Sequence, residues 1–230
     1  MIISHKYKFV FLKTNKTAGT SIEIALSKYC GADDIITPIT AEDEKTRRDL
    51  GYLGPQNYAS PIWDYGVRDV VKTLRKGKRK ARFYNHISAK KVRAYLGDQV
   101  WDSYYKFCFE RNPWDRIVSL YYWRCKSNPQ LTISEFVGST VPLVLKRRGF
   151  ELYTIDGQIA VDKICRFENL SEELEVVLKQ FGISEKLELP RAKSRFRRDK
   201  RSYRDILGEE EKAKIAELFC DEISLFGYEF

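Results

Sequence analysis

Apolar positions along the chain predict three strands that alternate with helices. Strand-sized apolar runs occupy residues 8–12, 104–110 and 161–167. After the first run, apolar side chains recur at helical spacing, at Ile22, Ala25, Leu26 and Tyr29. Strands that alternate with helices are typical of α/β proteins. The pattern therefore predicts an α/β fold in which a mostly parallel central sheet is flanked by helices.

Turn and capping signals indicate where the later helices begin. Asn112-Pro113 ends the second strand, and proline suits the first position of a helix. Ser171 is predicted to cap the helix that follows the third strand, and a last helix is expected from about Glu209. Residues 32–66 are rich in Gly and Pro turn signals, so we expect loops and short helices there.

Composition narrows the class of protein. The chain has 230 residues, of which 43% are hydrophobic and 13% aromatic, and this excludes a disordered protein. Its length suits a single domain spanning residues 1–230. No stretch approaches 18 consecutive apolar residues, so no membrane span is expected, and residues 1–8 lack the pattern of a signal peptide. The five cysteines lack metal-ligand spacing, which favours reduced thiols, a cytoplasmic protein and no metal site.

The positive charge is concentrated in two segments. The net charge is +9, but residues 72–82 hold seven basic residues and no acid, and residues 191–204 hold eight basic residues and one aspartate. The rest of the chain is mildly acidic. Such segments form either a solvated face or a site for an anion, and nucleic acid is one of the possible anions.

A polar loop, Lys13 to Ser21, lies between the first predicted strand and its helix. A helix N-terminus favours phosphate or sulfate, and small side chains at Ala18 and Gly19 let the backbone approach such an anion. Further groups could bind it through charge or hydroxyl donors: Lys16, Thr17, Thr20 and Ser21. The spacing is not that of a Walker A motif. A capped helix after a polar turn is the alternative interpretation.

The segment Phe9 to Glu23, FVFLKTNKTAGTSIE, resembles the 5′-phosphosulfate loop of sulfotransferases that use 3′-phosphoadenosine 5′-phosphosulfate. It is most similar to the carbohydrate-type branch, where the loop commonly reads PKTAGTS. Asn15 stands where the proline usually stands. That difference should change the stiffness of the loop more than its chemistry, because proline contributes no hydrogen-bond donor.

A second motif, Arg111-Asn-Pro-Trp-Asp-Arg-Ile-Val-Ser119, follows the second strand and resembles the 3′-phosphate motif of the same family. The resemblance implies that Arg111 and Ser119 bind the 3′-phosphate, a group that an arginine fork and a helical hydroxyl can hold. The alternative is that Arg111 and Arg116 form surface ion pairs with acidic neighbours, at Asp115 and Glu110. Together the motifs imply a P-loop-NTPase-like sulfotransferase fold.

The resemblance also implies a reaction: transfer of a sulfuryl group from 3′-phosphoadenosine 5′-phosphosulfate to a hydroxyl or amine. A carbohydrate or a small hydroxylated molecule is the expected acceptor, and no metal is required. Lys16 is expected to stabilise the leaving group, or only to bind the donor. His86 is the candidate base, because histidine titrates near neutral pH. His5 is set aside beside a terminus expected to be frayed, and Asp64 and Glu44 are reserve candidates.

The late basic segment resembles a loop that closes over the 3′-phosphate in related enzymes. The candidate donor-binding residues there are Arg198, Lys200, Arg201 and Tyr203. A solvated surface is the alternative. For residues 72–82 the alternatives are a site for an anionic acceptor and an exposed helix.

Three competing functions remain at this stage: a P-loop-type nucleotide kinase, a basic nucleic-acid-binding protein and a family member that only binds nucleotide. The missing Walker A spacing counts against the first. The paired phosphate motifs are not explained by the second, so no nucleic-acid partner is expected.

Overall fold

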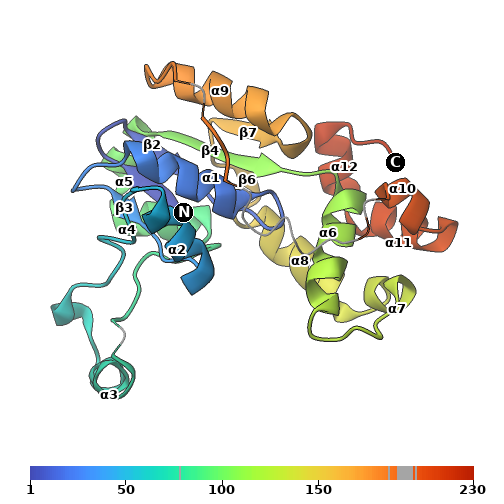
Figure 1. Cartoon of the computed structure of the whole chain (residues 1–230), viewed down its shortest axis with the longest axis horizontal. Helices are drawn as coiled ribbons and strands as arrows, with labels where there is room; N and C mark the ends of the chain where they lie inside the picture. Colours follow the sequence, from blue (N-terminus) through green and yellow to red (C-terminus); the bar gives the residue numbers. More distant parts are fainter. Residues whose placement is uncertain (78, 186, 191–198, 200) are drawn as a thin grey trace.

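The computed structural model describes residues 1–77, 79–185, 187–190, 199 and 201–230. Five strands form the central sheet in the order β3-β1-β2-β4-β7 (Figure 1). Their bounds are β1 Ile2–Ser4, β2 Phe9–Phe11, β3 Ile35–Ile36, β4 Tyr105–Glu110 and β7 Lys163–Arg166. Strand β2 pairs parallel with β4, and β4 with β7, whereas β1 is antiparallel to both of its neighbours. Four of the five strands thus point the same way, which confirms the predicted α/β fold with a mostly parallel sheet.

Side chains that alternate along β2 and β4 build a separate core on each face of the sheet. Phe9 and Phe107 belong to the core that packs under α1 (Gly19–Leu26) and α9 (Leu170–Gln180). Val10 and Cys108 belong to the opposite core, which includes side chains of α4 (Ala89–Leu96) and α5 (Asp98–Ser103). Strands β2 and β4 are therefore buried on both faces, as strands of a covered parallel sheet are.

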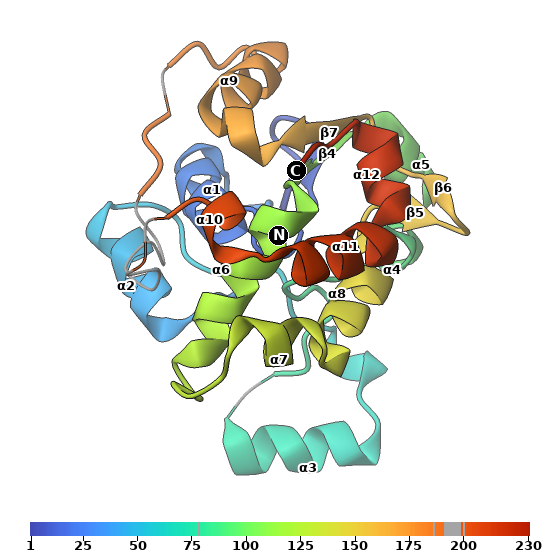
Figure 2. The same ribbon diagram turned by 90° about the vertical axis from the view of Figure 1, so that its right-hand side faces the viewer.

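A layer of helices lies beyond the carboxyl end of β4 (Figure 2). It consists of α6 Pro113–Cys125, α7 Ile133–Val137, α8 Thr140–Phe150, α10 Tyr203–Ile206, α11 Glu209–Leu218 and α12 Cys220–Phe226. Trp114, Phe136 and Phe219 are buried in its apolar core. The buried Arg116 guanidinium joins this layer to the sheet, because it pairs with Glu110 at 2.6 Å and with Glu222 at 3.4 Å.

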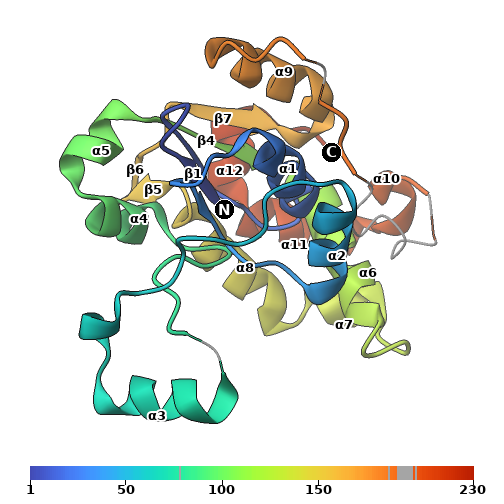
Figure 3. The same ribbon diagram turned by 60° about the vertical axis from the view of Figure 1, so that its left-hand side comes forward.

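The remaining short elements include α2 (Ala41–Asp49), the hairpin of β5 (Thr154–Ile155) and β6 (Gln158–Ile159), and three 3-10 turns. The turns are η1 Ser27–Tyr29, η2 Ile62–Asp64 and η3 Phe167–Asn169. Residues 59–81, which we call the arm, leave the body of the molecule and carry α3 (Val67–Lys76) at their far end (Figure 3). Within the part of the chain described, no helix is both long enough and apolar enough to cross a bilayer.

The structure confirms the main helix starts and corrects two expectations. Helix α6 begins at Pro113, and the Asn112 side chain caps it by accepting from the amides of Trp114 and Asp115. The helix after β7 begins at Leu170 with Asn169 in the N-cap position and no side-chain cap, so Ser171 lies inside the helix. The N-terminus is not frayed, because residues 1–4 are buried and β1 lies inside the sheet.

Candidate functional site

The loop between β2 and α1 has the backbone shape of an anion-binding nest. Lys16 has φ of 65° and Ala18 has φ of 56°, so two residues of the left-handed region alternate with residues outside it. Each such non-glycine residue costs about 1–3 kcal/mol, which the surrounding structure must offset. Alternation of this kind turns successive backbone N–H groups toward one side, where they can surround an anion.

The N-terminus of α1 adds to this arrangement. Its cap residue is Ala18, and in the described structure no side chain caps the helix. A side-chain cap therefore does not support the alternative interpretation, a capped helix after a polar turn. The first N–H groups of a helix carry a partial positive charge, which favours a phosphate or sulfate group. Thr20 and Ser21 lie in this first turn and are buried.

Gly19 is required for space rather than for a left-handed backbone. A Cβ atom at this position would lie 2.7 Å from Cγ of Lys13. The Lys13 side chain is itself buried, and its ammonium pairs with Glu23 at 2.7 Å and donates to Asn85 at 3.1 Å. The close approach of α1 to Lys13 thus depends on a residue without a side chain.

Two threonines tie the loop to the neighbouring strand. The Thr14 hydroxyl donates to the carbonyl oxygen of Phe109, at the end of β4. Since a carbonyl can only accept, the Thr17 hydroxyl must donate to Thr14, at 2.8 Å. The Thr17 side chain is therefore engaged inside the loop, and its expected contribution to anion binding comes from its backbone.

Arg111 joins the second motif to the loop. Its Nη1 donates to the main-chain oxygen of Lys16 at 2.9 Å, and its Nε and Nη2 donate to Asp115 at 2.8 and 2.7 Å. The guanidinium also lies over the ring of Phe167, 4.1 Å from the centroid. The ion pair with Asp115 does form, as one interpretation of the sequence expected. It is not a surface pair, because the two side chains are only 11% and 19% exposed.

One face of α6 borders the loop. Asp115, Ser119 and Trp123 follow one another at four-residue spacing, which places them along one side of the helix, and Arg111 lies just before its N-cap. The main-chain oxygen of Lys16 lies at the Arg111 end, whereas its Nζ lies 5.8 Å from the ring centroid of Trp123. The Lys16 side chain therefore extends along this face, on which the half-buried Ser119 also lies.

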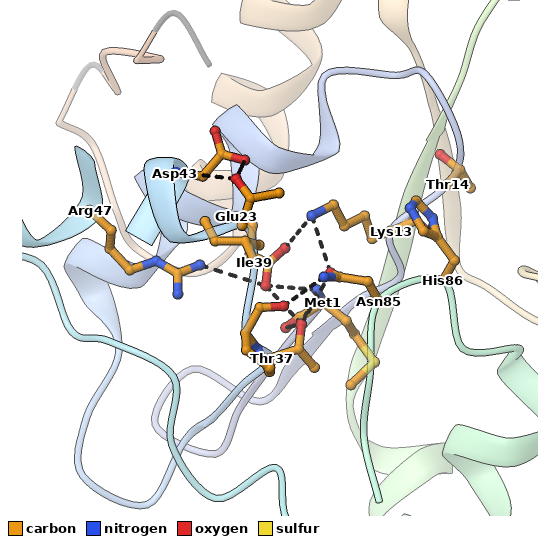
Figure 4. A network of polar contacts seen from close by, with 12 residues as sticks. Met1, Lys13, Thr14, Glu23, Thr37, Ile39, Asp43, Arg47, Asn85 and His86 are labelled. Carbon is orange, nitrogen blue, oxygen red and sulfur yellow. Dashed lines mark hydrogen bonds and ion pairs between the residues drawn. The ribbon is translucent and has the colours of Figure 1, made fainter. Parts of the chain in front are cut away.

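His86 lies at the start of the loop (Figure 4). Its Nδ1 is 2.9 Å from the carbonyl oxygen of Lys13, so Nδ1 must carry the proton and Nε2 is the unprotonated nitrogen. Desolvation and the positive charge of Lys13 lower the pKa of His86 from 6.5 to about 4, although the residue as a whole is exposed. The imidazole is therefore neutral at pH 7, as a proton acceptor must be.

A buried carboxylate positions the lysine beside His86 (Figure 4). Glu23 pairs with Lys13 at 2.7 Å and with the Met1 ammonium at 3.0 Å, and it accepts from Thr37 at 2.8 Å. Burial alone would raise the pKa of Glu23, but the positive charges of the Met1 amino group and Lys13 outweigh burial and lower it. Burial in turn lowers the pKa of the Met1 amino group to about 5, so Lys13 is the cation that remains beside Glu23 at pH 7. Glu23 is thus ionised and can hold the Lys13 ammonium in place.

The two reserve candidates for the base occupy other positions. Glu44 is paired with Arg47 at 3.0 Å on α2, and Asp64 is exposed on the arm. Of the two histidines, His86 contacts the loop, whereas Nδ1 of His5 contacts the Tyr104 hydroxyl at 2.7 Å.

Part of the late basic segment reaches the second motif. The Tyr203 hydroxyl accepts from the Asn112 amide at 3.3 Å. The Tyr122 hydroxyl donates to Asp199 at 2.7 Å, and Arg201 pairs with the same carboxylate at 2.7 Å. Arg198 and Lys200 lie outside the described residues.

Several residues at this site were not identified as site residues from the sequence. Lys13, Asn85 and Trp123 lie beside candidates that were identified, but their partners are distant in the sequence. The four-residue spacing from Ser119 is the signal that could have indicated Trp123. Among the described residues, no group of three or more His, Cys, Asp or Glu side chains is placed to hold a metal ion.

Comparison with known proteins gives a family, a relative and a similar structure. Residues 1–149 match the Sulfotransferase family, and this range contains the loop, His86, Arg111 and Ser119. An uncharacterized protein of Archaeoglobus fulgidus is 38% identical over 103 residues, which are 43% of this chain and 84% of the relative. A sulfotransferase from Alicyclobacillus acidocaldarius has a crystal structure that aligns over 97% of this chain and 96% of its own. The TM-score is 0.41 and the sequence identity 16%.

Proposed function

Because the chain belongs to the sulfotransferase family, we propose that it transfers a sulfuryl group from 3′-phosphoadenosine 5′-phosphosulfate to a hydroxyl or amine. The contact between Arg111 and the Lys16 main-chain oxygen is the observation that supports this donor most directly. It joins an anion-binding loop to an arginine fork, and the donor has phosphate groups at both the 5′ and the 3′ position.

The residues present fit such a donor. The left-handed residues Lys16 and Ala18 and the start of α1 favour the 5′-phosphosulfate. The Arg111 fork, with Ser119 two turns along α6, suits the 3′-phosphate. Tyr203 lies beside Asn112, so the late segment could close over that end of the nucleotide.

Lys16 supplies the positive charge for the transfer. As the bond between sulfur and the bridging phosphate oxygen breaks, negative charge grows on that oxygen, and a nearby ammonium stabilises it. Sulfur forms its new bond to the acceptor oxygen or nitrogen, and adenosine 3′,5′-bisphosphate leaves. Positioning along this in-line path contributes the rest of the rate enhancement.

His86 is the proposed base. Its Nε2 is unprotonated because Nδ1–H donates to Lys13, and Lys13 is in turn held by Glu23. The acceptor proton would pass to Nε2. Because a lower pKa makes a weaker base, this arrangement favours availability of the neutral form over base strength.

A carbohydrate is the proposed acceptor class, with a small hydroxylated molecule as the alternative. The support is the KTAGTS sequence at residues 16–21, which resembles the carbohydrate-type branch of the family.

Transfer of radiolabelled sulfate from the donor to panels of glycans and small hydroxylated molecules tests the proposed function. The wild-type protein should label at least one acceptor, and Lys16→Ala should abolish labelling while its circular dichroism spectrum is unchanged. Near-normal turnover by Lys16→Ala would contradict the mechanism. The same panel with radiolabelled ATP tests the kinase alternative.

A further inference from the structure

The arm (residues 59–81) stands away from the rest of the molecule (Figure 3). Its base is a short antiparallel stem, in which the Ser60 amide donates to Lys80 at 2.8 Å and the Arg82 amide donates to Tyr58 at 2.9 Å. Beyond this stem the chain forms η2 and α3. Every residue of α3 whose exposure is described is exposed or half-buried.

The apolar side of α3 faces solvent. Val67, Val70, Val71 and Leu74 have the i, i+3, i+4, i+7 spacing of one helix face, and Val67 and Leu74 are 83% and 80% exposed. Trp63, just before the helix, is 86% exposed. Scattered exposed apolar residues are ordinary, but a continuous apolar face on one helix indicates an interaction surface.

The helix also lacks the packing that normally stabilises a helix of this length. Isolated helices of about 12–15 residues or fewer are marginal in water, and α3 has 10. A partner that covers the apolar face would therefore stabilise α3 as well as bind it.

Charge distinguishes among the possible partners. Residues 59–81 contain seven basic residues and two acidic ones, for a net charge of +5. Arg68, Lys72 and Arg75 line one surface hollow together with Val67 and Val71, so cationic and apolar groups meet on the same side of the helix. A second copy of the arm would bring two +5 surfaces together. A nucleic acid would satisfy the charges but leave the Trp63 and Leu74 side chains in water.

We propose that the arm docks on the surface of an anionic lipid bilayer. Helices of this kind lie in the interface with apolar and Trp side chains at the acyl boundary and Lys and Arg among the headgroups. Trp63, Val67 and Leu74 insert, while Arg68 and Lys72 contact lipid phosphates. The chain returns to the body at Ala81, five residues before His86, so docking tethers the body that carries the candidate site to the membrane. The inference does not depend on the proposed function.

Co-sedimentation of the full chain with lipid vesicles tests the proposal. The protein should bind vesicles that contain phosphatidylglycerol, and bind pure phosphatidylcholine vesicles at least 10-fold more weakly. Intrinsic tryptophan fluorescence should shift to shorter wavelength on binding, and Trp63→Ser should remove that shift, since the other three tryptophans lie outside the arm. Trp63→Ser with Leu74→Ser should abolish binding, whereas Leu143→Ser with Val176→Ser, exposed apolar positions outside the arm, should not.

A charge variant separates headgroup contacts from insertion. Arg68→Gln, Lys72→Gln and Arg75→Gln together should weaken binding to the anionic vesicles about 100-fold, because each basic residue near such a surface contributes about 5-fold. The circular dichroism spectrum and the free energy of unfolding should stay unchanged, which would show that the body is intact.

Three results would overturn the proposal. The first is vesicle binding that is absent, or that the Trp63→Ser, Leu74→Ser variant retains. The second is a concentration-dependent dimer in sedimentation velocity that this variant abolishes, since the face would then bind a second copy. The third is salt-sensitive binding of duplex DNA or single-stranded RNA that exceeds vesicle binding and needs only the basic residues.

Discussion

The Arg111 guanidinium donates a hydrogen bond to the main-chain oxygen of Lys16 at 2.9 Å, across 95 positions of the sequence. Because the other side of the same guanidinium is held by Asp115, the arginine fixes the distance between the loop before α1 and the start of α6. A nucleotide with a phosphate group at each end could therefore be held by two elements whose separation is already set.

Replacement of Arg111 by lysine should weaken binding of adenosine 3′,5′-bisphosphate by about 10- to 100-fold and leave binding of AMP within about 2-fold. Lysine keeps the charge but loses the fork that can hold Asp115, Lys16 and a phosphate together. Isothermal titration calorimetry with both nucleotides measures the two affinities. If the affinities for adenosine 3′,5′-bisphosphate and for AMP fall equally, Arg111 only supports the loop.

The variant Gly19→Ala should destabilise the protein by about 1–3 kcal/mol, because its Cβ would overlap Cγ of the buried Lys13. Urea unfolding measures the free energy of unfolding. Gly54→Ala is the matched control, since a Cβ there would meet no described atom within 4 Å. A similar cost at both positions would show that the close approach at Gly19 is unimportant.

Removal of the buried Arg116 guanidinium should strongly destabilise the fold. Arg116→Met leaves the Glu110 and Glu222 carboxylates buried without their shared counter-charge, which typically costs about 3–5 kcal/mol. Arg93→Met, which breaks an exposed pair with Asp98, should cost less than about 1 kcal/mol. If denaturant unfolding shows that Arg116→Met and Arg93→Met lose similar amounts of unfolding free energy, the role given to Arg116 is contradicted.

In a plot of kcat/KM against pH, the fall in activity on the acid side should lie below pH 6.5, the ordinary pKa of histidine. Desolvation and Lys13 lower the pKa of His86 to about 4, so lowering the pH from 8 to 6.5 should leave its base form intact. Activity should fall only as the pH approaches the lowered pKa, where Nε2 becomes protonated.

His86→Gln provides the control for that profile. This variant should lower turnover at least about 100-fold, which is the lower end of the range expected for loss of a general base. It should also abolish the fall in activity on the acid side of the pH profile. If the variant keeps both the rate and this fall in activity, the proton acceptor is another group.

Local signals were enough to predict the elements that hold the candidate site, but not the contacts between them. The apolar runs, Gly19 and Asn112-Pro113 act within a few residues, so β2, α1, β4 and α6 could be placed from the sequence. The ion pair of Arg111 with Asp115 was likewise open to prediction, because the two are four residues apart.

Long-range contacts and weak local patterns were not predictable. The Nδ1 contact of His86 spans 73 positions, and no periodicity encodes it. Strand β1 lies in a segment that was expected to be frayed, and its place in the sheet is fixed by pairing with β2 and β3. The apolar stripe of α3 is present in the sequence, but only the structure shows that it faces solvent.

The most direct test of a donor held at both ends is calorimetry on the wild-type protein with adenosine 3′,5′-bisphosphate and with AMP. The account predicts that the bisphosphate binds at least about 10-fold more tightly, because charge-assisted hydrogen bonds to the 3′-phosphate are formed with only one of the two nucleotides. Equal affinities, or no binding of either, would contradict it.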